Sequence, residues 1–80
     1  MSVIKTPIEL GAAIKQGRKQ LGLTQSQLAL AAGVGVRFIG DLEAGKPTAH
    51  LGLTLTVIQA LGGELTLAGM PLSEELGNDA

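Results

Sequence analysis

The chain has 80 residues, a formal net charge of −1, no cysteine and a single aromatic residue, Phe38. A chain this short forms one small domain that buries only about 60% of its unfolded surface, and without cysteine it has neither disulfides nor thiolate metal sites to stabilise it. Its core must be built from aliphatic residues, which favours helices joined by short turns, and dimerisation is the remaining common stabilising device.

The first predicted helix begins at the string Thr6-Pro7-Ile8-Glu9. Threonine caps a helix, proline suits the first helical position, and the glutamate is placed to bond back to the cap amide. The helix is expected to end at about Leu21, before Gly22. Its inward face at helical spacing is Leu10, Ile14, Gly17 and Leu21. Lys15 and Lys19 fall on the outer face, where a solvated surface is favoured over a nucleic-acid contact.

Two short helices are expected next. Thr24-Gln25-Ser26-Gln27 is a second capping box, and the helix that it starts ends at Ala32 before Gly33. The following helix runs from Val36 to Ala44. The residues expected in the core of this pair are Leu28, Ala29, Ala32, Ile39 and Leu42, with Phe38 packed on the flank.

A fourth helix is expected to start at Thr48 as its cap and to reach about Leu61, with Leu51, Leu55, Ile58 and Leu61 inward. After Gly62-Gly63 the chain alternates polar and apolar residues, which predicts one short strand at 64–70. The residues that would pair in this strand are Glu64, Leu65, Thr66, Leu67 and Ala68.

A single strand leaves its backbone groups unpaired, and the economical solution is the same strand from a second copy. We therefore expect a domain at residues 1–63, a dimerisation strand at 64–70 and a flexible tail at 71–80. Residues 1–63 carry all six lysines and arginines against three acidic residues, a balance of +3, whereas residues 64–80 have a balance of −4. A solvating role for the acidic tail is favoured over docking of a partner.

The residue types between Gln25 and Ala44 are those of a helix-turn-helix motif. Ala29 is small enough for two helices to cross closely, and Gly33 suits a turn with positive φ. Apolar residues that would hold the two helices together are Val34, Ile39 and Leu42. With the strings Leu21-Gly22-Leu23-Thr24-Gln25 and Leu42-Glu43-Ala44-Gly45-Lys46, this pattern resembles the Cro/C1-type (XRE) repressor family. The resemblance implies an all-α, lambda-repressor-like domain of four to five helices with the motif at about residues 25–44.

A narrower resemblance rests on Thr6-Pro7 with Leu10, and on Gln59-Ala60-Leu61 followed by Leu65-Thr66-Leu67. This order is similar to that of HipB-type antitoxins. The resemblance implies a homodimer joined by the C-terminal strand, repression of its own operon, and binding to a HipA-type kinase toxin. Two alternatives stay open at this point: a stand-alone regulator without a toxin, and an interaction module that has lost its affinity for DNA.

A dimer of this family places two copies of the third helix in successive major grooves of palindromic DNA, about 34 Å apart. The residues expected at base edges are Val36, Arg37, Gly40 and Asp41. Arg37 is suited to bond guanine O6 and N7 together, and Val36 to touch a thymine methyl. Asp41 is expected to orient Arg37, in preference to accepting from cytosine. Gly40 allows close approach but weakens the helix by about 1 kcal/mol relative to alanine.

Phosphate contacts are expected from Thr24, Gln25 and Lys46, which would position the DNA without reading it. A simple capping pair is the alternative for Thr24 and Gln25. The family resemblance also implies an ion pair between Arg18 and Glu43, which is favoured over a DNA contact by Arg18.

Nothing in the sequence indicates catalysis. His50 has no neighbouring histidine or cysteine with which to bind a metal, and no serine lies in a nucleophile pattern. We expect no enzyme activity, no metal and no cofactor. No apolar run reaches the roughly 18 residues of a membrane span, and Met1 to Thr6 lacks the apolar core of a signal peptide. The expected partners are palindromic double-stranded DNA, a second copy and a HipA-type kinase, with no membrane, in the cytoplasm.

Overall fold

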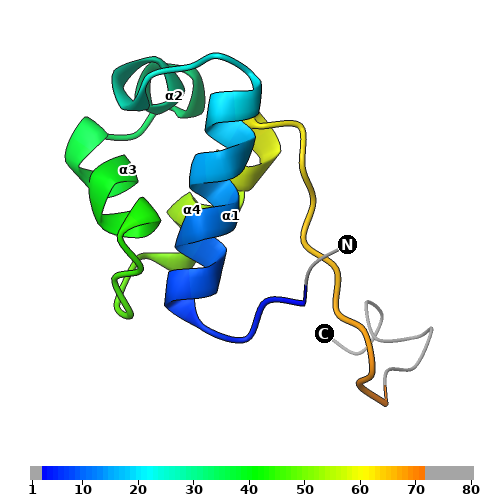
Figure 1. Cartoon of the computed structure of the whole chain (residues 1–80). Helices are drawn as coiled ribbons and strands as arrows, with labels where there is room; N and C mark the ends of the chain where they lie inside the picture. The colour runs from blue at the N-terminus through cyan, green and yellow to red at the C-terminus, as the bar shows by residue number, and fades with distance from the viewer. Residues whose placement is uncertain (1–2, 72–80) are drawn as a thin grey trace.

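The computed structural model describes residues 3–71, which form four helices and no strand (Figure 1). The helices are α1 (Pro7–Gln20), α2 (Gln25–Ala32), α3 (Val36–Glu43) and α4 (Leu51–Ala60). Helix α3 packs against both α1 and α2, and α4 packs against α2. The predicted all-helical domain is therefore confirmed, and its core consists of Ile14, Leu28, Ala29, Ile39, Leu42 and Val57.

Helix α1 starts as predicted at Thr6, whose hydroxyl oxygen accepts from the Glu9 amide at 3.1 Å. The Glu9 carboxylate, however, accepts from the amide of Lys5 at 2.8 Å instead of from that of Thr6, so the capping box is shifted by one residue. The predicted inward face is wrong at its C-terminal end, because Leu21 is 55% exposed. The chain turns outward there through Gly22, whose φ is +70°. The inward positions of α1 are Gly11, Ile14 and Arg18.

The α2–turn–α3 unit agrees with the sequence prediction. Thr24 and Gln27 form the reciprocal capping box, with N···O distances of 3.1 and 2.9 Å. Gly33 ends α2 in the left-handed conformation at φ +70°, which costs a glycine little. Leu28 and Ala29 of α2 face Ile39 and Leu42 of α3 in the core, and Phe38 packs against it from the flank.

Helix α4 begins later than predicted, and its predicted inward face is only partly right: Ile58 and Leu61 pack against the core, whereas Leu51 does not. Its N-cap is His50, whose Nδ1 accepts from the Leu53 amide at 3.2 Å, and Thr48 caps nothing. Leu51 is 67% exposed, whereas Thr54 and Val57 are buried. Burial of Thr54 is satisfied locally, because its hydroxyl donates to the His50 carbonyl at 2.8 Å. The helix is apolar on nearly all sides, so apolar spacing alone did not identify its inner face.

The segment after α4 leaves the helices and runs beside the N-terminal segment (Figure 1). No backbone hydrogen bond joins residues 64–71 to the rest of the described chain. The strand predicted at 64–70 is therefore not formed by one chain alone, and its pairing across a dimer stays a prediction. The predicted acidic tail, from Leu72 onward, lies outside the described residues. Within residues 3–71, none of the helices has the length and apolar character needed to cross a membrane.

Candidate nucleic-acid interface

Four residues from two successive turns form the outer face of α3. Val36 and Arg37 are exposed, and Gly40 and Asp41 are partly exposed. Ile39 and Leu42, on the opposite side, are buried and fix the rotation of the helix about its axis. The structure thus places all four predicted base-reading residues on one solvent-facing surface, which we call the α3 outer face.

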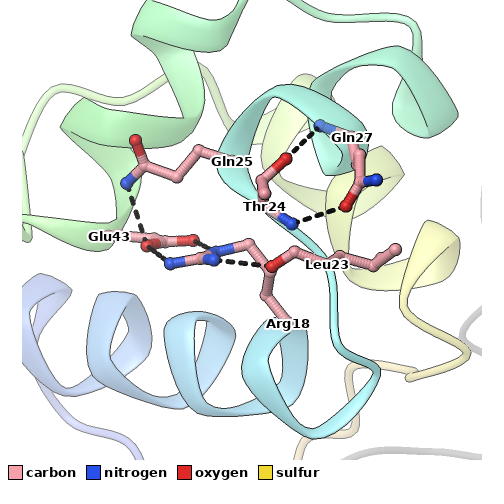
Figure 2. Close-up of polar contacts among 6 residues, drawn as sticks. All are labelled: Arg18, Leu23, Thr24, Gln25, Gln27 and Glu43. Atoms are coloured by element: carbon pink, nitrogen blue, oxygen red, sulfur yellow. Dashed lines mark hydrogen bonds and ion pairs between the residues drawn. The ribbon is translucent and has the colours of Figure 1, made fainter.

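A polar network at the C-terminal end of α3 joins three helices (Figure 2). Arg18 of α1 donates from Nε to Glu43 Oε2 at 2.6 Å and from Nη2 to Glu43 Oε1 at 3.0 Å. Its Nη1 donates to the Leu23 carbonyl at 2.7 Å, in the turn between α1 and α2. Gln25, the first residue of α2, donates from Nε2 to Glu43 Oε1 at 3.1 Å. The network fixes α1 and the start of α2 to the last turn of α3.

The ion pair inside this network is buried, with 9% of the Arg18 side chain and 3% of the Glu43 side chain exposed. Burial by itself raises the pKa of Glu43, but hydrogen bonds from Arg18 and Gln25 and the positive charge of Arg18 outweigh it, so the pKa lies below its usual value. The hydrogen bond to Glu43 likewise raises the pKa of Arg18. Both groups are charged at neutral pH, and Arg18 is oriented inward, away from solvent.

All three residues predicted to bind phosphate contact other groups of the protein, Lys46 through an ion pair with Asp41. The Thr24 hydroxyl oxygen caps α2, and the side-chain nitrogen of Gln25, Nε2, donates to Glu43. The backbone amides of Gln25 and Ser26 are not used within the described chain, and they point out of the first turn of α2. These amides and the hydroxyl proton of Thr24 are the donors that the start of α2 offers to an anion.

The predicted role of Asp41 in orienting Arg37 is wrong. Asp41 instead forms an ion pair with Lys46, at 3.6 Å between Oδ2 and Nζ. The Gly45 turn, with φ +86°, brings Lys46 back toward α3, and its amide donates to the Asp41 carbonyl. No carboxylate of residues 3–71 pairs with Arg37. Its guanidinium is therefore available to a ligand.

One residue and one contact that position this surface were not predicted from the sequence. The first is Gly11, where a Cβ atom would lie 2.7 Å from the Glu43 carbonyl oxygen and would overlap that of Leu42. A glycine in the middle of a well-capped helix was the available signal of this close approach. The second is Glu43 as the ligand of Gln25, for which sequence spacing gave no signal.

Comparison with known proteins agrees with this geometry. Residues 14–66 match the family described as Helix-turn-helix. The chain belongs to the Cro/C1-type (XRE) helix-turn-helix family. It is 58% identical over 59 residues to an uncharacterised HTH-type transcriptional regulator, y4mF, of Sinorhizobium fredii strain NBRC 101917 / NGR234. That alignment covers 74% of this chain and 78% of the relative. This XRE chain is accordingly similar to a transcriptional regulator.

Two solved structures of HipB show the same fold. One, a complex of HipB with a 20mer named O4, superimposes with a TM-score of 0.79 at 31% identity and covers 85% of this chain and 96% of the other. A complex named HipA-HipB-O2-O3 matches with a TM-score of 0.80 at 30% identity, covering 88% and 99%. The XRE chain is therefore HipB-like in structure, as the sequence indicated.

Proposed function

We propose that this protein is a sequence-specific DNA-binding repressor that acts as the antitoxin of a toxin–antitoxin pair. The observation that carries the proposal is the α3 outer face: four residues in register on a short helix, with an arginine that no carboxylate of the described chain holds. Such a helix fits the major groove, where the Arg37 guanidinium has the geometry to bond guanine O6 and N7. Val36, Gly40 and Asp41 complete the proposed base-reading set.

The proposed phosphate contacts lie near the C-terminal end of α3. The start of α2, with Thr24 and the free amides, is held to the last turn of α3 through Gln25, and Lys46 follows that turn in the chain. Asp41 is 3.6 Å from Lys46, so it holds the lysine near the α3 outer face while leaving ammonium protons for a phosphate oxygen. Few cations serve each chain, so two copies on one palindrome would supply much of the affinity.

The proposed dimer uses residues 64–68 of both chains as one antiparallel pair. Support comes from the exposed, unpaired backbone of this segment and from its two outward leucines, Leu65 and Leu67. Pairing would satisfy the backbone groups and cover apolar surface in one step.

The antitoxin role is supported by the HipB likeness, because one of the similar structures contains HipA with HipB. The proposed partner is a HipA-type kinase, neutralised by binding to this chain. The second candidate, a stand-alone regulator, is favoured by the relative named only as a transcriptional regulator. Co-purification of a kinase-like protein with the chain from its native cells distinguishes them, and purification without one favours the regulator.

Binding to the DNA upstream of its own gene tests the repressor proposal. We expect wild type to prefer this duplex over a scrambled one, with weaker binding at higher salt. Arg37→Ala should lose about 1–3 kcal/mol of that preference, as expected for one bidentate base contact. Lys19→Ala is the control, since it removes the same charge from the outer face of α1. Equal binding of wild type to both duplexes, or an unchanged preference in Arg37→Ala, contradicts the proposed reading by α3.

A further inference from the structure

The side chain of Gln25 is held in one orientation. Its Nε2 donates to Glu43 Oε1 at 3.1 Å, and the Glu43 carboxylate already accepts two hydrogen bonds from Arg18. An ionised carboxylate only accepts, so a reversed Gln25 amide would place two acceptor oxygens against each other. The carbonyl oxygen of Gln25 must therefore point away from Glu43.

That carbonyl oxygen points toward α3, as Figure 2 shows. A Cβ atom at Gly40 would lie 3.8 Å from Gln25 Oε1, so the oxygen lies beside the α3 outer face. No donor of the described chain reaches it, and every buried side-chain nitrogen or oxygen has a partner. It follows that Gln25 Oε1 is accessible to solvent. Because Gly40 has no side chain, this position of α3 leaves the oxygen uncovered.

The chemistry of this oxygen selects its ligand. A carbonyl oxygen accepts a hydrogen bond and donates none, so it is unsuited to a phosphate diester, which has only acceptor oxygens. In the major groove, the donors are the exocyclic amines of adenine, N6, and of cytosine, N4. A residue on α2 whose free acceptor lies beside Gly40 is therefore placed to meet a base amine approaching α3.

We propose that Gln25 is a specificity-determining residue that accepts a hydrogen bond from a base amine in the major groove, with Glu43 and Arg18 as its positioning residues. This rests on the proposed DNA-binding function and replaces the phosphate contact expected for the Gln25 side chain. Gly40, which weakens α3 as a helix, gains a role here, because it leaves the carbonyl open. The reading surface then spans two helices, with a donor at Arg37 and an acceptor at Gln25.

The test is selection of binding sites from randomised duplexes by the full chain. The variants are Gln25→Ala and Gln25→Met, of which the second keeps the length of the side chain without its amide. The control is Ser26→Ala, which changes the neighbouring exposed residue. We expect wild type and the control to select the same sites. Both Gln25 variants should lose the preference for one adenine or cytosine in each half-site, with about threefold to tenfold weaker binding there.

Base analogues identify the atom. At the position found, purine in place of adenine, or 2-pyrimidinone in place of cytosine, removes only the amine and should weaken wild type by the same factor. The Gln25 variants should not respond to this change. For adenine, 7-deazaadenine keeps the amine but lacks N7, and it should weaken wild type less than purine does, because Oε1 accepts from the amine whether or not the second proton of Gln25 Nε2 also reaches N7.

Three results would overturn the inference. Equal weakening of all duplexes by the Gln25 variants would indicate a phosphate contact, and a wild type that responds to 7-deazaadenine but not to loss of the amine would indicate that Gln25 donates to N7 instead of accepting from the amine. If Gln25→Ala and Gln25→Met keep every base preference of wild type, Gln25 does not read a base, and the proposed function is unaffected. Wild type without any preferred duplex would instead overturn the proposed function itself.

Discussion

Two glycines in helix interiors, Gly11 and Gly40, have opposite surroundings. At Gly11 an added Cβ would overlap the Leu42 carbonyl oxygen and lie 2.7 Å from that of Glu43. At Gly40 the nearest atom to an added Cβ is Gln25 Oε1, at an ordinary contact distance of 3.8 Å. The first glycine lets α1 approach the last turn of α3, whereas the second only leaves surface open.

We therefore expect Gly40→Ala to raise the free energy of unfolding by about 1 kcal/mol, through the higher helix propensity of alanine. Gly11→Ala should lower it by about 1–3 kcal/mol, because backbone atoms of α3 would have to move. Urea unfolding of the two variants beside wild type measures both values. Equal effects of the two substitutions would show that the close approach at Gly11 does not limit stability.

At the residue scale, the local roles of residues were easier to predict from the sequence than the partners that they contact. Capping residues and glycine stops, such as Thr24 and Gly33, act locally, and their roles were predicted correctly. The partner of Asp41 was not, because the choice between Arg37 and Lys46 depends on how the Gly45 turn returns the chain. Polar partners from different helices, such as Gln25 and Glu43, depend on packing that spacing along one helix does not describe.

Among the elements, α3 depends most on buried charge. Its last turn is fixed to α1 and α2 through Glu43, whose pKa is lowered mainly by Arg18 and Gln25 against the opposing effect of burial. For a carboxyl with a lowered pKa in the folded state, the stabilisation is complete above the unfolded pKa of about 4.3. It is lost as the pH falls through the lower folded pKa.

Glu43→Gln tests this dependence. At pH 7 the variant should be less stable than wild type by about 3–5 kcal/mol, because the buried Arg18 loses its counter-charge. The difference should shrink as the pH falls below about 4.3, because the unfolded wild-type chain then takes up a proton at residue 43 more readily than the folded state does, whereas glutamine does not titrate. Thermal or urea unfolding from pH 7 to pH 3 measures it, with Glu9→Gln at the exposed start of α1 as the control. A difference that is constant over this range would contradict the role assigned to Glu43.

Helix boundaries were predicted correctly where the cap residue and the glycine stop are unambiguous, as in α2. The prediction was wrong where two residues could serve as the cap. Thr48 and His50 both precede α4, and the imidazole of His50 is the one that accepts from the helix amide. The inner face of α4 was predicted in part: Ile58 and Leu61 pack against the core, but leucines lie on several sides of the helix and a threonine occupies a buried position. A buried Thr54 is stable only because its hydroxyl bonds to the preceding turn, a contact set by the true start of the helix.

At the scale of the whole molecule, the two terminal segments meet on one apolar surface. A groove between α1 and α4 is lined by Leu10, Ile14, Ile58 and Leu61, with Ile4 and Leu65 at its edge. Leu67 and Met70 extend the exposed apolar surface along the C-terminal segment. A single small domain leaves this surface to water, which fits the proposed pairing with a second copy.

Deletion of residues 64–80 should therefore convert a dimer into a monomer. Deletion of residues 72–80 alone is the control, since it removes the acidic end and keeps the segment proposed to pair. Light scattering coupled to gel filtration gives the mass of each. A tight dimer from the chain that ends at residue 63 would contradict the shared-strand proposal. The strand stays a prediction from alternating residues, because residues 64–71 have no backbone hydrogen-bond partner within the described chain.

A hydroxyl-radical footprint on the DNA upstream of the gene tests whether α3 reads this DNA. We expect two protected segments, related as an inverted repeat and centred about 10 base pairs apart, because each α3 of the proposed dimer would enter one major groove on the same side of the duplex. Arg37→Ala should abolish both at the concentration where wild type protects them. Uniform cleavage with wild type, at concentrations and salt where it binds the duplex, would show that α3 does not read this DNA.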